Sequence, residues 1–171
     1  MFTGAKGLRQ LGAAWTDRFI SVRPLRVSFL RDEDVRLLLT KPIPEFDLDY
    51  RPGALERLID LTRGQPFLTQ CVAYELVDLL NQDNRKHADA ADVDRAATKA
   101  LETGEAYFAN LWSDAEPDGQ AVLRALVRDG PVPAPGPVRT RLRELEILTD
   151  AGDFAVPLVR RWVEEQVRAG N

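Results

Sequence analysis

The chain has 171 residues and a formal net charge of −4, from 23 Lys and Arg against 27 Asp and Glu. This length suits one domain or two small ones and allows a sizeable core. The acidic balance argues against a dedicated nucleic-acid-binding or anionic-membrane protein. Because no apolar run approaches the roughly 20 residues that cross a bilayer, and the N-terminus lacks a signal-peptide pattern, we expect a cytoplasmic protein with no membrane partner.

The first part of the chain predicts a short helix, an extended stretch and a second helix. Residues 9–19 have a modest helical pattern, and residues 20–30 are rich in β-branched and aromatic side chains, which indicates extended chain or an edge strand. Three acids from Asp32 then precede an apolar run, and acids at this position favour the N-terminal end of a helix dipole. Residues 41–53 read as a loop.

The next two helices are separated by a Gly-x-Pro sequence. The first helix is expected to start near Pro52, and Gly64 stands where a helix end favours a left-handed residue. Pro66 then opens "PFLTQCVAYELVDLLNQ", whose apolar residues predict a helix buried on most sides. Cys71 is expected there as a small buried core residue, and as the single cysteine it excludes a disulfide within the chain.

A polar turn that includes His87 leads into a long amphipathic helix from Val93 to Trp112, in which Gly104 is a weak point. The stretch "SDAEPDG" that follows is interpreted as a boundary. After it we expect a helix, the proline-rich residues 130–138, another helix, a hairpin at residues 146–157 and a final helix. The sequence therefore predicts a mainly α fold, in which a helical bundle precedes a winged helix with a small β-hairpin wing.

Common catalytic and metal-binding residue sets are absent. With one His and one Cys, neither a nucleophile activated by histidine nor a Cys/His zinc site is supported. The many carboxylates are interpreted as helix starts and solvated loops, so we assign no catalytic residue and no metal site. The phosphate-binding sequence G-x-x-x-x-G-K-[ST] is missing, and we do not expect this chain to hydrolyse ATP by itself.

Several stretches, in order, resemble the C-terminal portion of STAND-type, AAA-like P-loop ATPases. "FTG" at the start is similar to the end of the sensor-one strand, and "VRPLRVSFLRDEDVRLLLTKPI" resembles the linker into the helical lid. "LIDLTRGQPFLTQCVAYELVDLLN" resembles the lid element with its Gly-x-Pro, and "AADVDRAATKALETGEAYFANLW" the helix that leaves the lid. "RLRELEILTDAGDFAVPLVRRWV" resembles the following winged helix.

The resemblance implies three units: the end of a nucleotide-binding core with its linker at residues 1–30, a helical lid at 31–112 and a winged-helix domain at 113–171. It also implies that Gly64 and Pro66 contact ATP or ADP held by a P-loop core, supplied in cis or in trans. The proline would offer a rigid apolar surface to the base, and the glycine would permit the turn. The alternative is that both residues only end one helix and start the next.

A second class of function is a winged-helix transcription regulator with a helical ligand or dimerisation domain. It would read the major groove with Arg139, Arg141 and Arg143. The proline-rich residues 130–138 oppose the middle helix of a helix-turn-helix, and the charges after Pro117 balance, so we expect other protein domains rather than DNA as partners. A helical adaptor with no nucleotide role is the third hypothesis.

Overall fold

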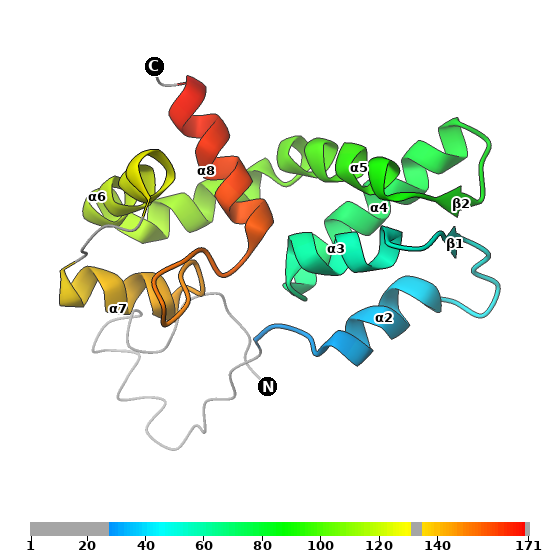
Figure 1. The fold of residues 1–171 in the computed structure, drawn as a ribbon, viewed down its shortest axis with the longest axis horizontal. Coiled ribbons are helices and arrows are strands. Elements are labelled where there is room, and N and C mark those ends of the chain that lie inside the picture. The colour runs from blue at the N-terminus through cyan, green and yellow to red at the C-terminus, as the bar shows by residue number, and fades with distance from the viewer. Residues whose placement is uncertain (1–27, 131–134, 170–171) are drawn as a thin grey trace, which may run out of the picture.

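The computed structural model describes residues 28–130 and 135–169. The expected helix at residues 9–19, most of the extended stretch and the centre of the proline-rich segment lie outside them. The described residues confirm a mainly helical fold with seven helices and one pair of short strands (Figure 1). The elements are α2 (Asp32–Thr40), β1 (Asp49–Tyr50), α3 (Ala54–Thr62), α4 (Pro66–Gln82), β2 (His87–Ala88), α5 (Ala90–Thr103), α6 (Glu105–Asp129), α7 (Gly136–Glu144) and α8 (Pro157–Ala169).

The helix starts follow the expected local chemistry. Acids occupy the whole first turn of α2, and Pro66 is the first residue of α4. The Gln65 side chain caps α4 by accepting a hydrogen bond from the Leu68 N–H at 2.6 Å. At α5, Asp89 and Asp92 form a reciprocal capping box, which ties down the N-terminus of this helix.

Two segments that were predicted as loop and turn contain a strand pair. β1 and β2 run parallel, with Asp49 opposite His87 and Tyr50 opposite Ala88. The prediction of a turn at His87 is therefore wrong, because its backbone belongs to β2. Its side chain is half-buried. Strands of two residues have no alternation long enough to be recognised in a sequence.

The long helix after β2 is divided differently from the expectation. Gly104 ends α5 with non-helical backbone angles, and α6 begins at the next residue. The interpreted boundary "SDAEPDG" is instead helical on both sides of a sharp bend at Glu116, where φ is 61° and ψ is 165°. Pro117 explains the bend, because a proline disfavours helical angles in the residue before it.

One continuous hydrophobic core joins all the helices. α4 packs along α5, α3 packs against both, and α8 packs on α6 while also reaching α3 and α5 (Figure 1). Phe108 lies at the junction of the two halves, fully buried and stacked on Trp162 of α8 with ring centroids 5.5 Å apart. Cys71, expected in the core, is only half-buried at its edge, with Sγ 3.5 Å from the Thr103 hydroxyl.

The C-terminal half has the expected order of helix, helix, hairpin and helix. Its hairpin consists of a single antiparallel bridge between Leu148 and Phe154. The described residues thus show no extended wing, and the winged helix stays a prediction. None of the described helices is both long and apolar enough to span a membrane.

Candidate functional site

The Gly-x-Pro turn between α3 and α4 is held against the segment that precedes α2. Gly64 has the predicted left-handed conformation, with φ of 74°. Its carbonyl oxygen accepts a hydrogen bond of 2.8 Å from the Leu30 N–H, and a Cβ at this position would lie 2.5 Å from the Leu30 carbonyl oxygen. Gly64 is therefore required by a close backbone approach as well as by its own angles.

Pro66 differs from Gly64 in exposure. Gly64 is buried, whereas Pro66 is half-buried and Phe67 beside it is exposed. The Phe67 ring stacks on Tyr107 of α6 with centroids 4.8 Å apart. Of the two residues predicted to contact a nucleotide, Pro66 is thus the one that retains accessible side-chain surface.

Buried hydroxyls on both sides of the turn join α3 to α4. The Thr69 hydroxyl donates to the Thr62 hydroxyl at 3.1 Å, which in turn donates to the Leu58 carbonyl oxygen at 3.0 Å. Both threonines are fully buried. Since a buried hydroxyl is costly unless it is hydrogen-bonded, this chain of donors fixes the two helix ends relative to each other.

A surface pocket of about 220 Å³ opens beside the turn. Its lining combines apolar side chains with one acid and one base: Leu30, Asp32, Val35, Ile59, Arg63 and Gly64. Arg63, itself in a left-handed conformation with φ of 49°, forms an exposed ion pair of 2.7 Å with Asp60. The pocket thus combines apolar side chains with charges of both signs where residues 28–30 meet the turn.

The three arginines predicted as DNA readers all make contacts within the C-terminal half. Arg139 donates to the Asp150 carbonyl oxygen at 2.8 Å, and Arg143 pairs with the Asp150 carboxylate. Arg141 is turned toward the bend of α6. It donates to the Ala115 carbonyl oxygen at 3.1 Å and pairs with the carboxylates of Glu116, at 3.2 Å, and Asp118.

Arg141 compensates for the bend in α6. A break in a helix leaves carbonyl groups without their usual N–H partners. Here the Trp112 carbonyl oxygen accepts from the Gln120 side chain at 3.0 Å, and the Ala115 carbonyl oxygen accepts from Arg141. Only 24% of the Arg141 side chain is exposed, so its first role in this fold is structural.

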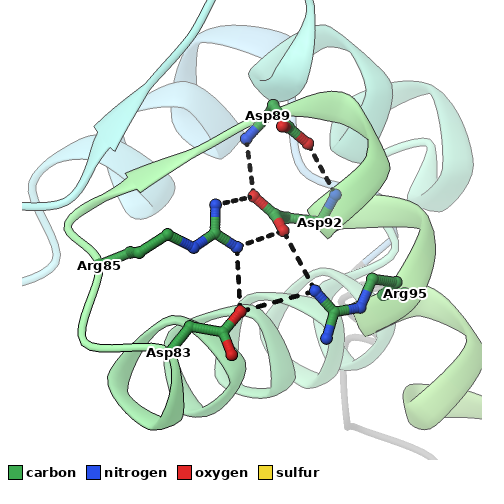
Figure 2. Close-up of polar contacts among 5 residues, drawn as sticks. All are labelled: Asp83, Arg85, Asp89, Asp92 and Arg95. Carbon is green, nitrogen blue, oxygen red and sulfur yellow. Dashed lines mark hydrogen bonds and ion pairs between the residues drawn. The ribbon is translucent and has the colours of Figure 1, made fainter.

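A network of charged side chains lies at the corner between α4 and α5 (Figure 2). Arg85 binds both carboxylate oxygens of Asp92, at 2.9 and 2.5 Å, and Asp83 and Arg95 extend the network. Asp92 is 4% exposed. The hydrogen bond from Arg85 lowers the pKa of Asp92, while burial opposes the shift. These groups neutralise one another and cap α5, so we interpret the corner as structural.

The sequence did not identify the Ser28–Glu146 contact or the position of Tyr107, whose ring stacks on Phe67 beside the Gly-x-Pro turn. The Ser28 hydroxyl donates to the Glu146 carboxylate at 2.5 Å, between residues 118 positions apart. Burial raises the pKa of Tyr107 to about 12, and the negative charge of Glu146 adds to this rise. No local pattern marks such a contact, because it depends on how the two halves pack.

Within residues 28–130 and 135–169, no group of three or more His, Cys, Asp or Glu side chains is arranged to hold a metal ion. The chain matches no protein-family model, no curated protein and no solved structure. Function must therefore be argued from the geometry of the turn and its surroundings.

Proposed function

We propose that this chain is the lid and winged-helix portion of a STAND-type, AAA-like ATPase. In this role it senses adenine nucleotide at the Gly64–Pro66 turn and relays the nucleotide state to its C-terminal half. The P-loop core that holds the phosphates is supplied in cis or in trans, and this chain alone does not turn over ATP. Phosphate release above a buffer control, lost on substitution of a residue in this chain, would contradict the last point.

The observation that carries the proposal is the pocket beside the turn. Gly64 forms part of its wall, and Leu30 and Ile59, both half-buried, provide apolar surface that a base could contact. Arg63 and Asp32 add one charge of each sign at the rim, and Arg63 also pairs with Asp60. Pro66 follows Gly64 by two residues and keeps part of its rigid ring accessible, so a base bound against the turn itself would touch a surface that loses little entropy on binding.

The test is the affinity for ADP of the chain combined with a P-loop core, with and without Pro66→Ala. Loss of an apolar contact of this size weakens binding by about five- to thirtyfold. The same substitution lowers the stability of the chain by only about 0.4–1 kcal/mol, since it mainly frees the unfolded state. Pro157→Ala is the matched control, because Pro157 is likewise the first residue of its helix, α8.

The result separates the two interpretations of the turn. A weaker affinity for Pro66→Ala with unchanged affinity for Pro157→Ala supports nucleotide sensing. Equal ADP affinity of both variants and the unmodified chain would leave Gly64 and Pro66 as a helix end and a helix start.

A further inference from the structure

The linker residues 28–30 touch both halves of the molecule. At one end, the Leu30 N–H donates to the Gly64 carbonyl oxygen in the Gly-x-Pro turn. At the other, the Ser28 hydroxyl donates to Glu146, which lies just after α7. Residues 28–30 thus connect the Gly-x-Pro turn with the C-terminal half.

A second route connects the same two places through aromatic rings. Phe67, which follows Pro66, stacks on Tyr107, and Tyr107 packs edge to face on Phe108 with centroids 5.4 Å apart. Tyr107 also lies close enough to Glu146 for the carboxylate charge to affect its phenol. Phe108 in turn stacks on Trp162 of α8, so the rings link the turn to the C-terminal half.

Glu146 is held in an unusual conformation at this point. Its φ is 57°, in the left-handed region that non-glycine residues rarely adopt. The Glu146 N–H donates to the Arg143 carbonyl oxygen at 3.0 Å, which ends α7 and sets the direction of the Glu146 side chain. The backbone thus positions a carboxylate where the Ser28 hydroxyl can reach it.

We infer that the Ser28–Glu146 hydrogen bond is a latch that keeps residues 28–30 on the Gly-x-Pro turn. Releasing Glu146 loosens the Leu30–Gly64 contact, while the buried core still holds the two halves together. This regulatory meaning rests on the proposed function, because it is through the turn that nucleotide would act. The latch itself is a property of the chain without nucleotide.

The latch is tested by hydrogen exchange at the Leu30 amide, which reports on the bond to Gly64. Ser28→Ala, Glu146→Ala and the double variant are compared in the full chain by NMR. Each single variant is expected to speed exchange at Leu30 by about two- to fivefold, the loss typical of one hydrogen bond. The double variant is expected to match Glu146→Ala, since the Ser28 hydroxyl has no Glu146 carboxylate to bind in either variant.

Glu144→Ala is the matched control, because Glu144 is an exposed carboxylate two residues away at the end of α7. The latch would be overturned if exchange at Leu30 were no faster in Ser28→Ala than in this control. It would also be overturned if exchange in the double variant were clearly faster than in Glu146→Ala. Ser28 is exposed, so its variant decides the matter even if Glu146→Ala impairs folding. Since no nucleotide is present, the result is independent of the ADP experiment.

Discussion

The backbone N–H of Leu30 donates to the carbonyl oxygen of Gly64 across 2.8 Å, and this contact brings the linker over the turn between α3 and α4. The approach leaves no room for a side chain at Gly64. This glycine thereby fixes both the shape of the turn and the path of the chain that enters α2.

We expect Gly64→Ala to lower the free energy of unfolding by about 2–4 kcal/mol, through left-handed strain plus a clash with the Leu30 backbone. Gly53→Ala separates the two causes, because Gly53 has φ of 85° but a Cβ there would meet nothing within 4 Å. It should lose only about 1–2 kcal/mol. Urea denaturation measures both, and equal losses would show that the Leu30 contact is unimportant.

Substitutions of Thr62 and Thr69 should destabilise the contact between α3 and α4 by different amounts. Thr62→Val removes the acceptor of the buried Thr69 hydroxyl and should cost about 1–2 kcal/mol. Thr69→Val leaves Thr62 donating to the Leu58 carbonyl oxygen, so its cost should be smaller. In the double variant, the loss in denaturation experiments should fall below the sum of the single losses. Strict additivity would contradict the hydrogen-bonded chain.

Asp92→Asn should destabilise the protein by about 1–3 kcal/mol near neutral pH, because Arg85 loses its charged acceptor. The folded pKa of Asp92 lies below its ordinary value of 3.8, so the carboxylate contributes stability above that pH. This contribution is lost as the pH falls toward the folded pKa. The difference between the unmodified chain and the variant should therefore be constant from about pH 5 to pH 8 and shrink below about pH 4.

The control for the Asp92 experiment is Asp94→Asn on the same helix. Asp94 pairs with Arg57 at 2.9 Å, but 46% of its side chain is exposed. An exposed pair of this kind contributes about 0–1 kcal/mol. Equal losses in Asp92→Asn and Asp94→Asn, or a difference that persists at low pH, would show that burial of Asp92 is not decisive.

Arg141→Ala tests the DNA-reading hypothesis together with the bend of α6. We expect a loss of about 1–3 kcal/mol in thermal or urea unfolding, because Arg141 bonds the Ala115 carbonyl oxygen and two carboxylates. Arg143→Ala, which removes an exposed pair with Asp150, should cost no more than about 1 kcal/mol. We expect no specific duplex binding by anisotropy at physiological salt. Nanomolar binding that depends on Arg141 would favour the regulator.

The parts of the fold that sequence reasoning predicted are those with local causes. Acids before α2, Pro66 at the start of α4 and the left-handed Gly64 each follow from chemistry within one helical turn. Local reasoning did not predict that α6 runs through the stretch "SDAEPDG", with a bend at Glu116. A proline marks a break in the backbone but does not show whether packing continues past it.

The candidate site was only partly predictable. Gly64 and Pro66 are proposed as nucleotide contacts from the resemblance to the lid of STAND-type ATPases, and only their predicted conformations at a helix end and a helix start are confirmed. Ser28 and Glu146 could not be proposed, because 118 positions separate them and neither belongs to a recognisable motif. The pairing of β1 with β2 was missed for the same reason, since its two partners come from segments that look like loops.

The parallel pairing of β1 with β2 has a consequence for the order in which the chain folds. The two strands can meet only after α3 and α4, which lie between them in sequence, have folded back on each other. Closing this loop costs chain entropy before the few strand hydrogen bonds repay it. We therefore expect the two strands to pair late, after the helices between them have packed.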